Sequence, residues 1–189
     1  MTFALHLAVL AARARRPIRR LLRDKRGISA VEFAMLLPLM VTLYLGGVEV
    51  SQAVAIDRKV TLVARTLGDL VAQATTVTNS DMSNILAATA AIIVPYADAR
   101  LKITVSSVAI DANGIAKVAW SDTKNGTARA VGTTVTLPTA LNTPSSSLIW
   151  AESEYAYTPT IGYVITGTMN LKDQIYMRPR LSDSVTRTP

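Results

Sequence analysis

The longest apolar stretch of the chain runs from Ile28 to Val50, and its only charged residues are Glu32 and Glu49. A helix needs about 20 mostly apolar residues to cross the hydrocarbon core of a bilayer. This stretch is long enough to cross it with some tilt. The pattern therefore predicts a transmembrane helix over residues 28–50.

Beyond this stretch the apolar residues recur at alternating spacings of three and four, which is typical of one stripe along an amphipathic helix. We therefore expect an amphipathic stalk helix over residues 51–76, continuous with the apolar one. The interpretation we favour is that the stripe packs on the protein's own globular part. A self-associating coiled coil is the alternative, but it needs a longer run of heptads. The stripe consists of Ala53, Ile56, Val60, Val63, Leu67, Leu70 and Ala74.

Residues 77–189 are expected to form one exported α+β domain. Apolar residues at helical spacing between Met82 and Ile93 predict a second helix, which Pro95 ends. A short polar side chain before this run is expected to cap the helix. The candidates for this cap are Asn79, Ser80 and Asp81.

The sheet is predicted from β-branched, alternating runs. Residues 101–110 and 115–121 read as a hairpin around the turn signal Asp111-Ala112-Asn113-Gly114, with Trp120 in the core. Residues 148–158 alternate strictly and predict another strand. The predicted fold class is therefore α+β: a long N-terminal transmembrane and stalk helix, then a small domain with an antiparallel β-sheet and a packed helix.

The net charge of +7 resembles that of a nucleic-acid-binding protein, but its placement argues against one. Residues 1–27 hold eight Lys or Arg residues and one acid, Asp24, which accounts for the whole excess. The remaining residues hold equal numbers of basic and acidic side chains. Binding to nucleic acid needs a basic face on the folded domain. We therefore expect no nucleic-acid partner.

Candidate chemistry is sparse. The chain has no cysteine, and its single histidine, His6, lies in the N-terminal segment, so no Cys or His catalytic or zinc site can form in the domain. Glu152 and Glu154 share a strand face and are expected to be solvated rather than to act as an acid–base pair. We predict that the protein is not an enzyme, with no catalytic residue, no metal, no cofactor and no small-molecule substrate.

The apolar stretch allows three interpretations. It can be an uncleaved signal anchor, or a secretory signal peptide cleaved after Ala55, where Ala53 and Ala55 form an A-x-A pattern. Its length argues against the second, because the apolar core of a signal peptide usually spans about 7–15 residues. In either the first interpretation or the third, a pilin-type leader, the basic residues place residues 1–27 in the cytoplasm and the domain across the membrane.

The junction at Gly27 favours the pilin-type leader. The basic segment ends in Lys25-Arg26-Gly27, the apolar stretch begins at once with Ile28, and Glu32 is the fifth residue from there. This arrangement resembles a prepilin processing site. The resemblance implies cleavage between Gly27 and Ile28 by a prepilin peptidase, which leaves the apolar stretch intact as a new N-terminus.

Glu32 is the candidate assembly residue, because a carboxylate in a membrane segment is costly and marks a functional position. The resemblance implies that it pairs with the amine of Ile28 on a neighbouring subunit. Such a contact in a low-dielectric bundle sets the axial register between subunits. The simpler alternative is an acid in the first helical turn, favoured by the helix dipole and facing the headgroups.

The string RGISAVEFA over residues 26–34, followed by Pro38, resembles the TadE-like family of minor pseudopilins. Gly46-Gly47-x-Glu49 also fits that family's membrane segment. Four later segments are similar to C-terminal regions of TadE/TadG-type proteins, with less specificity. They are Trp120-Ser121, Leu137-Pro138, Tyr155 to Pro159, and Arg178 to Arg180.

The family resemblance implies a minor pilin-like structural subunit that assists assembly of a tight-adherence, Flp-type pilus. Its expected partners are the prepilin peptidase, the pilus assembly machinery, other pilin-like subunits and the membrane, which it spans once. Its expected location is the bacterial inner membrane, with the domain in the periplasm and possible incorporation in the pilus. The alternatives are an unprocessed, signal-anchored periplasmic binding or sensory module, and a secreted domain released after Ala55.

Overall fold

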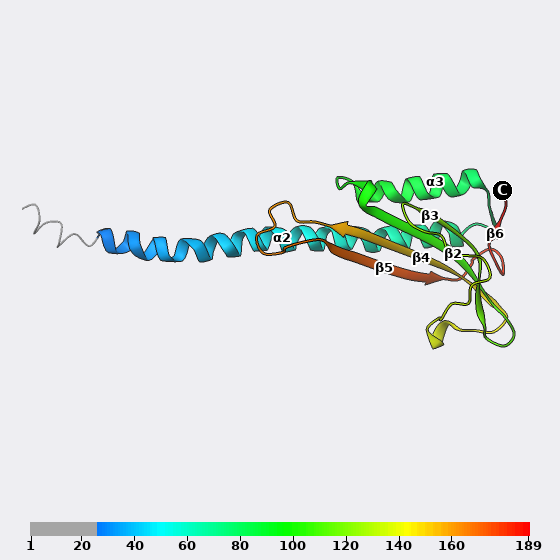
Figure 1. Cartoon of the computed structure of the whole chain (residues 1–189). Coiled ribbons are helices and arrows are strands. Elements are labelled where there is room, and N and C mark those ends of the chain that lie inside the picture. Colours follow the sequence, from blue (N-terminus) through cyan, green and yellow to red (C-terminus); the bar gives the residue numbers. More distant parts are fainter. Residues whose placement is uncertain (1–25) are drawn as a thin grey trace, which may run out of the picture. The chain divides into compact units, whose positions relative to one another are not determined.

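The computed structural model describes residues 26–189, which divide into two compact units at Gly46 and Gly47. Helix α2 spans Arg26–Ala72 and contributes residues to both units. It ends four residues before the predicted boundary at residue 76, because Thr76 and Val77 form strand β1 instead. Figure 1 shows α2 with the strands and the second helix.

The second unit, Gly47–Pro189, is built on an antiparallel sheet with the strand order β3-β2-β4-β5. The predicted hairpin is confirmed, and Gly114 provides the positive φ of 79° that its turn requires. The Asp111 carboxylate accepts hydrogen bonds from the backbone N–H groups of Asn113 and Ile115 and so fixes the turn. The sheet consists of β2 (Leu101–Ile110), β3 (Ala116–Lys124), β4 (Ser146–Tyr157) and β5 (Met169–Met177).

A second helix, α3 (Asn79–Ala90), packs on the sheet with the later part of α2. Its N-cap is Thr78 rather than one of the three predicted residues. Thr78 and Asp81 form a reciprocal capping box, in which each side chain accepts a hydrogen bond from the other's backbone N–H. Short 3-10 turns lie at Ala91–Ile93, Asp98–Arg100 and Thr139–Leu141.

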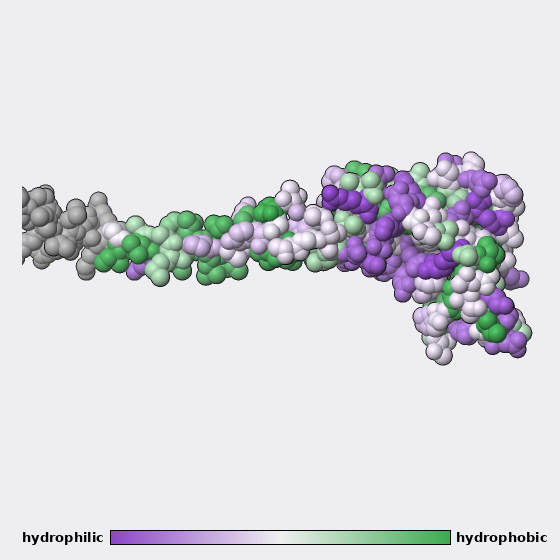
Figure 2. All heavy atoms as spheres, in the orientation of Figure 1, coloured by the Kyte–Doolittle hydropathy of each residue, from purple (hydrophilic) through white to green (hydrophobic). Residues whose placement is uncertain are grey.

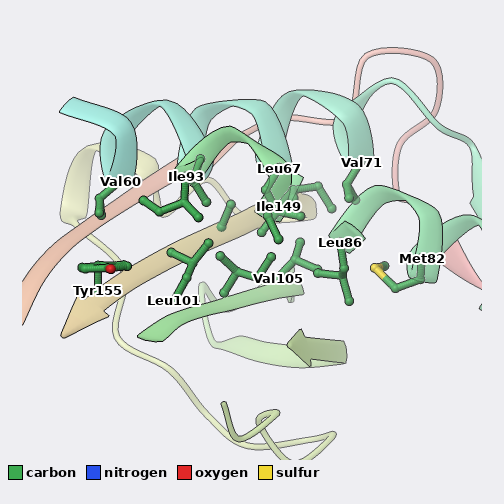
Figure 3. Close-up of a cluster of buried hydrophobic side chains, with 14 of the residues drawn as sticks. Val60, Leu67, Val71, Met82, Leu86, Ile93, Leu101, Val105, Ile149 and Tyr155 are labelled. Carbon is green, nitrogen blue, oxygen red and sulfur yellow. The ribbon is translucent and has the colours of Figure 1, made fainter. Parts of the chain in front are cut away.

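The main core lies between these two helices and one face of the sheet. Figure 3 shows Val60, Leu67 and Val71 of α2 and Leu86 of α3 pointing toward strand residues such as Ile149. Packing of the stalk stripe on the protein's own domain is thus confirmed. Trp120 also lies in this core, as predicted.

The stripe on α2 follows a straight helix rather than a strict heptad. Val71 is fully buried, whereas the predicted stripe residue Leu70 is 38% exposed. A straight α-helix drifts by about 20° per heptad from a 3.5-residue repeat, so the buried position moves by one residue toward the end of the helix. This drift fits a helix that packs on a sheet instead of supercoiling around another helix.

The last residues of the chain close the fold. Strand β6 (Thr186–Arg187) pairs in parallel with β1 (Thr76–Val77), and Val185 is buried in the main core. The Trp120 indole Nε1–H donates to the Val185 carbonyl at 2.7 Å. The Arg187 guanidinium pairs with the Asp122 carboxylate.

Candidate functional site

The first candidate site is the part of α2 that precedes Gly47. From Ile28 to Tyr44 its large apolar side chains are exposed on all sides, and they form the green surface along the helix in Figure 2. Among the described residues, α2 is the helix long and apolar enough to cross a membrane, and none of its most apolar window is buried. A helix that is apolar all round needs an apolar environment outside its own chain.

Gly27, Ile28 and Glu32 lie within the first turns of this exposed helix. A side-chain carbon placed on Gly27 would meet no atom within 4 Å, so the fold does not require glycine here. Glu32 is exposed on a surface that is otherwise apolar. Helical geometry places it beside residues 28 and 36 on the same face. The candidate cleavage site and the candidate carboxylate are therefore separated by about 7.5 Å along the helix axis.

The second candidate site is Glu49, in the second unit. Its side chain is only 1% exposed, and its carboxylate accepts hydrogen bonds from three consecutive backbone N–H groups of the β4–β5 loop. The donors are Tyr163 at 2.8 Å, Val164 at 3.1 Å and Ile165 at 2.8 Å. Gly162, with φ of +63°, precedes this run and turns the donors toward one point.

No sequence pattern pairs Glu49 with this loop, because the two are separated by more than 100 residues. The available signals were weak ones. Glu49 is a lone acid at the end of an apolar stretch, and the loop contains Gly162 and Gly167 among apolar residues. Tyr157, the last residue of β4, also binds α2 beside this loop. Its hydroxyl donates a hydrogen bond to the Glu49 carbonyl at 3.3 Å. Burial, followed by the nearby Glu49 charge, raises the pKa of the Tyr157 hydroxyl.

The third candidate is a groove on the sheet face opposite the helices, with a volume of about 810 Å³. Both predicted solvent-facing acids line it, and both are ion-paired: Glu152 with Arg129, and Glu154 with Lys102 and Lys172. Ligand sites of this size are predominantly apolar. A polar groove whose charges are mutually neutralised is therefore better explained as a solvated sheet face.

Aromatic side chains flank this groove. The rings of Trp150 and Tyr176 stack with centroids 5.3 Å apart, and the Arg129 guanidinium lies 3.8 Å from the Trp150 ring centre. Arg129 therefore bridges an aromatic ring and the Glu152 carboxylate, which fixes the segment after β3 onto the sheet.

Within residues 26–189 no group of three or more His, Asp or Glu side chains is placed to hold a metal ion. His6 and the basic residues from Arg13 to Lys25 lie outside the described residues. The predictions that the protein uses no metal, no cofactor and no catalytic residue remain predictions.

A family model described as TadE-like protein matches residues 27–68. The resemblance drawn from residues 26–50 is therefore confirmed and extends into the stalk. No curated protein and no solved structure matches the chain. The matched residues include Gly27, Glu32 and Glu49, but they end before the domain, so the resemblance drawn for the later segments stays a prediction. The matched residues are thus similar to TadE-like proteins, a family related to the Tad pilus.

Proposed function

We propose that this TadE-like chain is a minor pilin-like subunit that assists assembly of a tight-adherence, Flp-type pilus. One observation carries the proposal: the family match begins at Gly27 and covers an apolar helix that lies exposed until the chain reaches its own domain. Such a helix fits a protein that first resides in a membrane and then packs against similar helices. The membrane-spanning segment proposed is residues 28–50, with residues 51–76 as the stalk and residues 77–189 as the exported domain.

Prepilin-type processing between Gly27 and Ile28 is the first part of this proposal. The exposed glycine supports it, because the surrounding structure offers no packing reason for a residue without a side chain at this position. Cleavage would create a new amine at Ile28. A prepilin peptidase is accordingly the proposed processing partner, and the domain is proposed to be periplasmic.

Subunit register through Glu32 is the second part. Its carboxylate is exposed on an apolar helix face, where removal from water is costly unless a cation accompanies it. The amine of a neighbouring subunit's Ile28 would meet that need. The pairing would fix how far one helix slides along the next, which a purely apolar contact leaves undefined.

The mature N-terminus, measured by mass spectrometry of protein from its native membrane, tests the processing step. We expect a start at Ile28, and we expect Gly27→Ala to reduce cleavage. Gly47→Ala is the matched control, because it is a helical glycine of the same chain that also has open space around it. A start at Met1 in wild-type protein contradicts the proposal and leaves an unprocessed, membrane-anchored module. A start at Ile56 instead indicates a released domain.

Glu32→Ala separates assembly from processing. We expect this variant to be cleaved normally but to be lost from complexes with other pilin-like subunits, measured by co-purification from solubilised membranes. Ser29→Ala, on the same exposed stretch, should retain both properties. Normal co-purification of Glu32→Ala would show that the carboxylate does not set the register.

A further inference from the structure

The loop between β4 and β5, residues 158–168, is unusually apolar for an exposed connection. No residue from Tyr155 to Leu171 carries a charge. Ile161 is 50% exposed, and Tyr163 and Val164 are exposed to a similar degree. Surface loops that face water are normally polar, so three neighbouring exposed apolar side chains indicate a contact with something apolar.

This loop is fixed to one position along α2. The Glu49 carboxylate binds its three consecutive N–H groups, and Figure 1 shows the loop beside the helix. Glu49 follows the two glycines at the end of the apolar stretch. The same hydrogen bonds bury the charge, so that the junction presents no exposed carboxylate.

The helix surface next to Glu49 is also apolar. Val50 and Val54 are exposed, lie on one helix face, and precede Asp57, which is the next charged residue along α2. Within the second unit, the loop and this face thus lie at Glu49, where the apolar stretch of α2 ends in the sequence, and no charged residue follows along the chain until Asp57. This continuity along the chain argues for the same partner as that of the apolar stretch, which is lipid.

We propose that loop 158–168 is a second membrane contact, which inserts Ile161, Tyr163 and Val164 into the boundary between the headgroups and the acyl chains. The inference rests on the proposed membrane anchoring of α2. Apolar groups held at this boundary reach about 5–10 Å into the bilayer. The loop would hold the domain against the membrane surface before assembly.

A single cysteine label tests the contact, since the native chain has no cysteine to interfere. Full-length protein carrying Ile161→Cys, labelled with a fluorophore, is reconstituted in phosphatidylcholine–phosphatidylglycerol vesicles. Some of the lipids carry a spin-label quencher either near the headgroup or near the chain end. We expect the quencher near the headgroup to quench the Ile161 label at least about twofold more than the label of the control variant, as for a group within the interface.

Val131→Cys is the matched control. Val131 is apolar and 71% exposed, and it lies in a loop of the same unit. The backbone N–H of its neighbour Gly132 donates a hydrogen bond to the Val118 carbonyl. In the sheet, Val118 of β3 pairs with Val108 of β2, which in turn pairs with Leu148 of β4. Tyr157, the last residue of β4 before the loop, lies nine positions beyond Leu148. At the rise of a β-strand, the two loops are therefore about 30 Å apart along the sheet. We expect little quenching of this label.

Leu39→Cys, in the apolar stretch, separates this inference from the proposed anchoring. If the Leu39 label is quenched near the chain end but the Ile161 label is quenched no more than the Val131 label, the loop contact is wrong and the anchor stands. If Leu39 is not quenched, both fail. An Ile161 label that is shielded from aqueous iodide but not quenched by lipid also overturns the inference, because it indicates a protein contact.

Discussion

The two parts of α2 differ in where their apolar side chains lie and in how exposed they are. From Ile28 to Tyr44 the large apolar side chains cover the helix on every side and are exposed, as with Leu39 at 57%. After Gly47 they are gathered on one face, where Leu67 is fully buried against the sheet. Charged residues appear between the stripe positions only in the second part, beginning at Asp57.

This difference shows that the distribution of apolar residues, more than their number, decides what a helix packs against. The later part has a polar face for water and an apolar face for its own domain. The earlier part has no polar face, so water is a poor environment for any of its sides. It depends on lipid or on other helices, whereas the later part is stabilised by the same chain.

The largest expected difference between the two parts of α2 is their response to charges introduced at equally exposed positions. Leu36→Arg with Met40→Arg places two charges on one face of the apolar stretch, at a cost of about 6 kcal/mol for insertion in a membrane. We expect most of this variant to leave the membrane fraction on alkaline extraction.

Leu62→Arg is the control, because Leu62 is 51% exposed in the later part of α2 and is expected to face water. This variant should remain in the membrane fraction at the wild-type level. Equal retention of both variants would mean that the exposed apolar stretch is not in contact with lipid.

A truncation in the buried stripe should have the next largest effect. Leu67→Ala removes a fully buried side chain and should lower the free energy of unfolding by about 2–5 kcal/mol. Leu62→Ala should change it by less than about 0.5 kcal/mol. Urea unfolding of the full chain in detergent, followed by the fluorescence of Trp120 and Trp150, measures both. Similar values for the two variants would contradict the assignment of the buried face.

Release of the loop at the junction between the two parts should have a local effect. Glu49→Ala removes the acceptor of three backbone N–H groups, so the amides of Tyr163, Val164 and Ile165 should exchange with solvent on the order of tenfold faster. Hydrogen–deuterium exchange measures this change. Gln52→Ala, one turn further along the helix, should leave these amides protected.

The smallest expected effect concerns α3, which covers the same sheet face as the later part of α2. Hydrogen bonds from the Thr78 side chain and then its backbone N–H hold the pKa of Asp81 below its ordinary value of 3.8. The folded state therefore gains stability at pH above 3.8 and loses it as the pH falls through the folded-state pKa.

Asp81→Asn should accordingly lower the midpoint of thermal unfolding at pH 7 by a small amount, and the difference from wild type should shrink below pH 3.8. Thermal scans across this range measure it, with Ser80→Ala as an exposed neighbouring control. A difference that is constant with pH would show that the carboxylate charge does not contribute to the cap.

Local patterns predicted much of this structure. The strict alternation of residues 148–158 and the turn signal at Asp111–Gly114 identified β4 and the hairpin, because both depend on neighbouring residues. The strand order and the role of the C-terminal residues were not predictable in this way. No local pattern identified β5 or β6, whose partners lie far away in the sequence.

The candidate site residues also differ in whether a local sequence pattern could identify them. Gly27, Ile28 and Glu32 could be chosen from the sequence because their meaning lies in a contiguous motif, and their roles stay predictions. The pairing of Glu49 with the β4–β5 loop could not be chosen, because it needs the sheet to bring Tyr163 next to α2. A carboxylate that binds backbone amides leaves no side-chain partner for a sequence pattern to reveal.

The parallel pairing of β6 with β1 has a consequence for export. Val185 completes the core and Arg187 binds Asp122, so the domain lacks part of its core until the last residues join it. If the domain crosses the membrane as proposed, β6 follows β1, because it comes later in the chain than the strand with which it pairs. The core around Val185 would then be completed only after Val185 and Arg187 have crossed.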